Sequence, residues 1–236
     1  MIFKQLFDSD TSTYTYLLGC ESSRKAILID TVATQIDSYL ALLKELNLTL
    51  IYTLETHVHA DHVTAAGILR EKAGSKSVVH RDAGAMCADL MVTDGVFLQI
   101  GSIEIKVLHT PGHTSGCVSY LLADRVFTGD ALLINGSGRT DFQQGDPATL
   151  YRSITQKLFT LPADTLVYPG HDYHGITVSS IKQEIALNPR LGNGKTEAEF
   201  IAMMSQLQLP YPKHIDEALP ANQACGKPQQ SLLQQG

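Results

Sequence analysis

Apolar residues along this chain alternate between two kinds of spacing, and each change of spacing marks a predicted strand or helix. Short runs or alternations of apolar residues predict strands, and apolar residues recurring once per helical turn predict helices. The predicted strands cover 2–7, 14–20, 25–30, 48–54, 77–80, 95–99, 103–108, 117–122, 125–127 and 165–168. The predicted helices cover 33–46, 62–73, 147–159, 178–187 and 196–207, with a helical turn over 84–90. Because strands and helices alternate in both halves, the pattern predicts an α/β fold.

Two of the predicted helices carry start signals. Thr196 and Glu199 have the spacing of a capping box, and Asp61 has the side chain to cap a helix that starts at His62. From residue 210 the chain is rich in Pro and Gln, and its final ten residues are expected to be mobile.

The segment Thr56-His57-Val58-His59-Ala60-Asp61-His62 places three imidazoles and a carboxylate next to one another. It lies on a strand-to-helix loop, where functional side chains are commonly presented. In extended backbone His57 and His59 point to the same side. Imidazoles packed this closely are costly unless a metal, a proton relay or hydrogen bonds employ them. Since imidazole is the commonest metal ligand, the segment predicts a metal site.

Composition limits the expected size and partners of the protein. The 236 residues, 44% of them hydrophobic, predict a single domain over 1–236 with a short C-terminal extension from about residue 190. The formal net charge is -6 and no basic run occurs, so nucleic acid and membrane surfaces are not expected partners. No apolar run is long enough to span a membrane, and the N-terminus does not read as a signal peptide.

The cysteines predict a reduced protein. Cys20, Cys87, Cys117 and Cys225 are scattered, and no Cys-x-x-Cys occurs. A disulfide framework is therefore not expected, and a reduced cytoplasm is the expected compartment. Cys225 is interpreted as a surface or packed thiol.

Three further loops carry candidate ligands, each at the end of a predicted strand: His113, Asp130 and His171. The ordered set His-x-His-x-Asp-His, then His, Asp and His, resembles the metallo-β-lactamase superfamily over about residues 10–190. The resemblance implies a four-layer αβ/βα sandwich, with two sheets packed face to face and helices outside.

The second half resembles one family within that superfamily, the persulfide dioxygenases. The likeness rests on Gly138-Arg-Thr-Asp-Phe-Gln-Gln-Gly145, Tyr168-Pro-Gly-His-Asp-Tyr-His-Gly175 and Leu187-Asn-Pro-Arg190, and it continues in Ile215-Asp216, Pro220-Ala-Asn222 and Cys225-Gly226. This family, which includes the human ethylmalonic encephalopathy protein, oxidises glutathione persulfide with O2 and water to sulfite and glutathione.

The resemblance implies one Fe(2+) per chain, held by His57, His113 and Asp130. Two imidazoles and one carboxylate form a facial triad that leaves open positions on iron for a persulfide and O2. The remaining donors would surround these ligands and orient them: His59, Asp61, His62 and His171. A hydrolytic dinuclear zinc site would instead use all of these donors as ligands.

The resemblance also gives candidates for substrate binding and catalysis. Arg139 could pair with a glutathione carboxylate, because a guanidinium matches a carboxylate bidentately, although an ion pair with Asp141 is the structural alternative. Tyr173 could hydrogen-bond the bound sulfur or the peptide part of glutathione, or be a structural tyrosine at a pocket rim. Arg190 is a further candidate for the anion. Ser137 stands where the family often has Cys.

Two alternative functions remain open from the sequence. One is a zinc thioesterase like glyoxalase II, a hydroxyacylglutathione hydrolase, which usually has a different sequence after Gly-Arg and a longer helical C-terminal domain. The other is a metal-binding partner module without catalysis. A homodimer is one candidate assembly.

Overall fold

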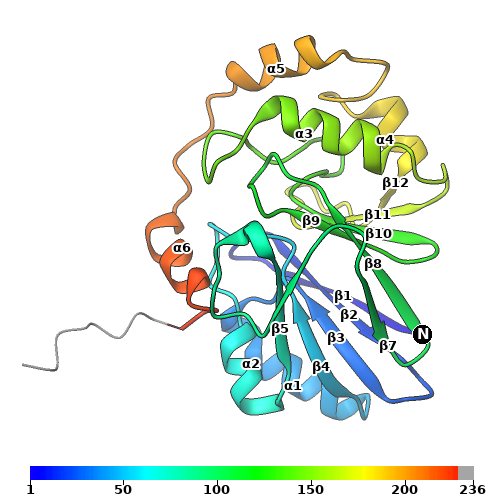
Figure 1. Cartoon of the computed structure of the whole chain (residues 1–236), viewed down its shortest axis with the longest axis vertical. Coiled ribbons are helices and arrows are strands. Elements are labelled where there is room, and N and C mark those ends of the chain that lie inside the picture. Colours follow the sequence, from blue (N-terminus) through cyan, green and yellow to red (C-terminus); the bar gives the residue numbers. More distant parts are fainter. Residues whose placement is uncertain (228–236) are drawn as a thin grey trace, which may run out of the picture.

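The protein is a four-layer sandwich in which two sheets face each other and helices cover both outer faces (Figure 1). The computed structural model describes residues 1–227. The predicted metallo-β-lactamase-like αβ/βα architecture is therefore confirmed. Within residues 1–227, no helix is long and apolar enough to cross a membrane.

The first sheet has the strand order β1-β2-β3-β4-β5-β6. The pairs β1–β2 and β2–β3 are antiparallel, and the pairs β3–β4, β4–β5 and β5–β6 are parallel. Its strands are β1 (Ile2–Asp8), β2 (Thr13–Gly19), β3 (Lys25–Ile29), β4 (Thr49–Leu54), β5 (Lys76–His80) and β6 (Leu90–Val92).

The second sheet has the order β12-β11-β10-β9-β8-β7. The pair β10 and β11 is parallel and the other pairs are antiparallel. Its strands are β7 (Phe97–Ile100), β8 (Ile103–His109), β9 (Val118–Leu121), β10 (Arg125–Gly129), β11 (Leu166–Pro169) and β12 (Ser179–Ser180).

The main core lies between the two sheets. Tyr16, Tyr120 and Phe127 are the largest fully buried side chains there, and branched aliphatic residues from both sheets surround them. This burial explains the apolar runs in the central strands, since residues on the inner face of each sheet must leave water.

Helices pack on the outer faces through two further apolar clusters. One cluster joins the first sheet to α1 (Ile36–Glu45) and α2 (Ala66–Ala73). The other joins the second sheet to α3 (Pro147–Ser153) with its π-helical continuation Ile154–Leu158, α4 (Ile181–Leu187) and α5 (Glu197–Ser205). The predicted capping box of Thr196 and Glu199 is present at the start of α5.

The start of α2 corrects the sequence prediction. The helix begins at Ala66 rather than at His62, and Asp61 does not cap it. Asp61 instead bonds His62 and His171 through its side chain. The predicted helical turn over 84–90 is also wrong, because a 3-10 turn at Arg81–Ala83 precedes it and β6 begins at Leu90.

The C-terminal part contains a helix that the sequence analysis did not predict, α6 (Ile215–Gln223). It lies at the side of the sandwich (Figure 1). No disulfide framework was expected, but one disulfide joins Cys87 and Cys225 across 138 positions of sequence, so the interpretation of Cys225 as a surface or packed thiol is wrong. Of the final ten residues, predicted to be mobile, 228–236 lie outside the described residues.

Candidate metal centre

All the predicted metal ligands meet at one edge of the sandwich. They follow the ends of β4, β8, β10 and β11, and backbone hydrogen bonds connect the segments at this edge. Val118 N donates to Thr56 O at 2.8 Å, and Gly170 N donates to Gly129 O at 2.8 Å. Because β10 and β11 are parallel neighbours, Asp130 and His171 emerge side by side.

The donor atoms of His57, His113 and Asp130 lie within 4.8 Å of one another. His113 Nδ1 donates to the Arg139 carbonyl at 2.7 Å, which leaves Nε2 with its lone pair. The Thr56 hydroxyl donates to Asp30 at 2.8 Å and accepts from His57 Nδ1 at 3.0 Å, which leaves Nε2 of His57 free as well. Both imidazoles are thus held in the tautomer that a metal ligand needs.

His59, Asp61 and His62 form an adjacent group of donors within the same limit of 4.8 Å. His59 Nε2 is 3.1 Å from Asp30 and 3.4 Å from Glu55, and His62 Nδ1 is 2.7 Å from Asp61. The opposite nitrogens, His59 Nδ1 and His62 Nε2, are buried with no hydrogen-bond partner among the described residues. Orphaned buried nitrogens are costly unless they face a cation or water, so the donor set is suited to a metal.

His171 lies between the two groups and has both nitrogens engaged. Nδ1 is 2.7 Å from Asp130 Oδ1, and Nε2 is 2.9 Å from Asp61 Oδ2. A ring that donates to a carboxylate on each side offers no lone pair to a metal in this arrangement.

Burial and neighbouring charge move the pKa values here in opposite directions. Burial lowers the pKa of His57 well below its usual value, and the charges of His59 and His113 lower it further. Burial alone would lower the pKa of His171, but the Asp130 and Asp61 carboxylates raise it well above its usual value. Burial would raise the pKa of Asp130, yet His171 holds it well below the usual range. His57 is therefore neutral and Asp130 ionised at neutral pH, as metal ligation requires.

A third group of donors, His80, Asp82 and His109, lies at the ends of β5 and β8. The His80 and His109 rings are stacked with centroids 3.9 Å apart and an interplanar angle of 14°. Lone pairs lie in the ring planes, so near-parallel rings cannot direct them at one ion. We interpret this pair as packing.

A cavity of about 540 Å³ opens over the candidate metal ligands. Its wall includes His57, Asp61, His113 and Asp130, the predicted substrate residues Arg139, Tyr173 and Arg190, and the segment 209–214. The fold therefore brings the predicted metal and substrate residues to a single cavity.

Arg139 already has a bidentate partner in Asp141, at 2.7 and 2.8 Å. Its Nη1 also donates to the Pro210 carbonyl at 2.8 Å. The structural alternative for Arg139 is thus present, and it leaves two of five guanidinium N–H groups unused by these bonds.

The other substrate candidates differ in exposure. Tyr173 is 69% exposed, and its ring lies parallel to that of His171 at 6.3 Å. Arg190 donates to the Ser137 carbonyl at 2.6 Å, so part of its donor capacity holds the loop before Arg139. Ser137 is 3% exposed and lies on the same wall.

Several site residues were not singled out from the sequence. The Asp30 and Glu55 carboxylates contact His59 Nε2. Asn222 of α6 donates hydrogen bonds to backbone carbonyls of the histidine loop. Asp30 and Glu55 directly follow the apolar strands β3 and β4, and this acidic end to a buried strand was the available signal. The position of Asn222 had no comparable local signal.

Comparison with known proteins identifies the superfamily. The pattern of the metallo-beta-lactamase superfamily matches residues 9–171, well over half of the chain. The chain belongs to the metallo-β-lactamase superfamily.

Within the superfamily, the chain belongs to the persulfide dioxygenases. It is 49% identical over 229 residues to the mitochondrial persulfide dioxygenase ETHE1 of Homo sapiens, covering 96% of this chain and 89% of the human protein. The crystal structure of ETHE1 from Myxococcus xanthus superposes with a TM-score of 0.94 at 56% identity, covering 96% of this chain and all of that one, 100%. A hydroxyacylglutathione hydrolase of Brucella anthropi is 38% identical over 168 residues, covering 70% of this chain and 62% of that protein.

Proposed function

We propose that this protein oxidises glutathione persulfide with O2 and water to sulfite and glutathione, using one Fe(2+) held by His57, His113 and Asp130. The observation that carries the proposal is similarity to persulfide dioxygenases over almost the whole chain, and the cavity over the candidate ligands is consistent with it. The free Nε2 atoms of both histidines and the ionised Asp130 carboxylate support the proposed iron site. Two imidazoles and one carboxylate are a ligand set typical of non-haem Fe(2+).

The residues around the iron ligands would fix orientation and hold protons. When bound, iron supplies the redox chemistry between the persulfide sulfur and O2. The bond from His113 Nδ1–H to the Arg139 carbonyl keeps that ring in the ligating tautomer. His171 holds one Asp130 oxygen, which leaves the other directed toward His113 at 3.7 Å. His59, Asp61, His62 and His171 are assigned to this supporting set.

The cavity wall would bind the glutathione part of the substrate. Arg139 keeps two N–H groups beyond its bonds to Asp141 and Pro210, enough to bind a carboxylate. Tyr173 projects a hydroxyl from a largely exposed position at the rim, and Arg190 lies on the same wall. These groups are suited to a small anionic peptide carrying a persulfide.

The alternative function is zinc-dependent hydroxyacylglutathione hydrolysis. It is favoured by the complete donor set, including the orphaned nitrogens of His59 and His62, and by the similarity to the Brucella enzyme. That similarity covers less of the chain than the similarity to ETHE1.

One experiment separates the two functions. Protein purified without oxygen is analysed for metals, then assayed for O2 uptake with glutathione persulfide and for hydrolysis of a glutathione thioester. We expect one iron per chain, persulfide-dependent O2 uptake and no thioester hydrolysis. Two zinc ions per chain with thioester hydrolysis and no O2 uptake would establish the alternative.

A further inference from the structure

One buried side chain of α6, Asn222, holds the loop that carries the histidine cluster. Its Nδ2 donates to the carbonyl oxygens of His59 and His62, both at 2.8 Å, and its Oδ1 accepts from Thr64 N at 2.8 Å. Asn222 is 4% exposed. A carboxamide makes at most about four hydrogen bonds, so most of its capacity is used on this single loop.

The helix α6 depends on tertiary contacts for its position. It has 9 residues and contains Pro220, and a helix this short is marginal in water on its own. Leu219 packs against the small apolar cluster of Val58, Val79 and Ala85. At the C-terminal end, Gly67 N donates to Cys225 O at 2.8 Å, and Cys225 is bonded to Cys87.

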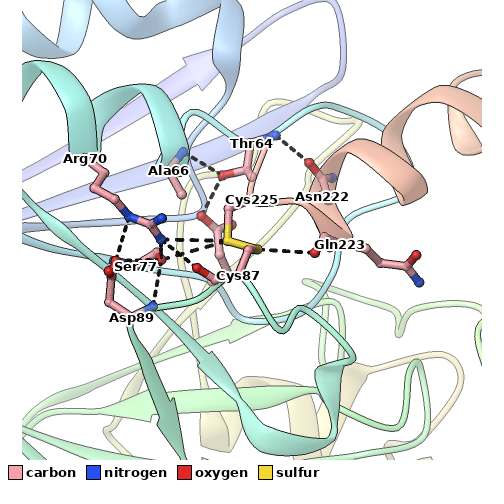
Figure 2. The surroundings of a disulfide bond; sticks show 10 residues. Thr64, Ala66, Arg70, Ser77, Cys87, Asp89, Asn222, Gln223 and Cys225 are labelled. Carbon is pink, nitrogen blue, oxygen red and sulfur yellow. Dashed lines mark hydrogen bonds and ion pairs between the residues drawn. A yellow bond between two sulfur atoms is a disulfide. The ribbon is translucent and has the colours of Figure 1, made fainter. Parts of the chain in front are cut away.

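Figure 2 shows that Asn222 and Cys225 lie on the same short segment. Asn222 is bonded to Thr64, and Cys225 is bonded to Cys87. The disulfide therefore fixes the end of α6 only three positions beyond the side chain that holds the loop.

We propose that Asn222 is a positioning residue of the metal centre, and that the Cys87–Cys225 disulfide is a thiol-sensitive lock that keeps Asn222 in place. This inference rests on the proposed metal centre and concerns its regulation. With the lock closed, the loop has one backbone arrangement and binds the metal tightly. With the lock open, the end of α6 separates more readily and the metal is held less tightly.

The sulfur environment indicates how the lock opens. Cys87 is half-buried, whereas Cys225 is 4% exposed and lies 3.9 Å from Arg70 Nη2. A glutathione thiolate attacks the Cys87 sulfur, the sulfur–sulfur bond breaks, and Cys225 leaves as a thiolate beside the Arg70 guanidinium (Figure 2). A second glutathione attacks the mixed disulfide, which releases Cys87 and oxidised glutathione. Two electrons pass from two glutathione molecules to the cysteine pair, and their thiol protons end on Cys87 and Cys225.

The first test concerns Asn222. Asn222→Ala removes all three bonds to the loop, and we expect the dissociation constant for Fe(2+), measured anaerobically by chelator competition, to rise about 10–100-fold. Amide exchange at Thr64 should accelerate. Gln223→Ala, on the exposed face of the same helix, is the matched control and should change neither quantity. An unchanged dissociation constant in Asn222→Ala would show that this residue has no role in positioning the metal centre.

The second test concerns the lock. Reduction with glutathione, or the double substitution Cys87→Ser and Cys225→Ser, should raise the Fe(2+) dissociation constant of otherwise unaltered protein. In an Asn222→Ala background reduction should have no further effect, because both changes act through the same contact. An equal effect of reduction in both backgrounds, or four titratable thiols in protein never exposed to reductant, would overturn the lock. A wild-type chain that binds no Fe(2+) would instead refute the proposed metal centre, so the two failures are distinguishable.

Discussion

The Arg139 guanidinium lines the cavity and is paired with Asp141. If Arg139→Ala removes a charge-assisted bond to a glutathione carboxylate, the loss should be roughly 1.5–3 kcal/mol, or about 10–150-fold. The Arg139 side chain is only 18% exposed, so solvent screens this contact less than a bond at the open surface.

The loss should appear mainly in KM for glutathione persulfide. The carboxylate is remote from the reacting sulfur, so ground state and transition state share the contact and kcat changes little. Iron content should not change, since the bond from His113 is made to the Arg139 backbone carbonyl, which the substitution keeps. Arg139→Lys should recover little, because a point charge cannot keep Asp141 and bind a carboxylate in the same fork geometry. The assay is steady-state O2 uptake against persulfide concentration.

Asp141→Asn is the matched control. It weakens the bidentate pair but leaves the guanidinium and its bond to Pro210 in place. If Arg139 binds substrate, this variant should keep a KM close to that of the unaltered protein. Equal rises in KM for Asp141→Asn and Arg139→Ala would mean that the ion pair only shapes the loop, and a normal KM in Arg139→Ala would refute substrate binding outright.

His113→Ala should abolish metal loading, whereas His59→Ala should keep iron with affinity lowered about 10–100-fold; equal and complete loss in both, by elemental analysis, would refute the assignment of ligands. Removing the metal with a chelator should abolish O2 uptake, and Fe(2+) but not Zn(2+) should restore it. Burial, and then the charge of His109, lowers the pKa of His80 to about 4. Between pH 6.5 and 4 His80 is therefore protonated in the unfolded chain but neutral in the folded chain. The free energy of unfolding falls as the pH drops through that window. At about pH 4.5 the loss of unfolding free energy amounts to about 2 kcal/mol. In denaturant titrations, His80→Gln should lose less stability than the unaltered protein between about pH 7 and about pH 4.5. Equal losses would contradict the reasoning.

Most of the fold could be predicted because its signals are local. The strands β1 to β5 and the helices α1 and α5 lie where apolar spacing places them, and the capping box of Thr196 and Glu199 forms as its spacing indicates. The prediction was wrong where tertiary contacts override a local signal. Asp61 has the side chain of a helix cap, but two histidines bind it more strongly than a free backbone N–H could. Likewise α6 has Pro220 inside it and forms against the apolar cluster around Val58.

The positions of the donors in the candidate site could be predicted from local signals, but their roles could not. The donors could be predicted because each follows a strand: His57 follows β4 of the first sheet, and His113, Asp130 and His171 follow β8, β10 and β11 of the second. These four strands run to the same edge of the sandwich. Their roles could not be predicted from position, because a role depends on which nitrogen is already bonded.

The proposed regulation of the site could not be predicted from the sequence, because it depends on contacts between residues far apart in the chain. Asn222 reaches His59 across 163 positions, and Cys87 reaches Cys225 across 138. A cysteine isolated in sequence reads as a free thiol, since no spacing rule connects residues that only the fold brings together. The proposed substrate is a persulfide and the proposed product is a thiol, glutathione. The product of the reaction is therefore also the thiol that would reduce the disulfide supporting the metal loop. If that coupling operates, thiol accumulation would weaken metal retention through Asn222, a form of product feedback that requires no separate binding site.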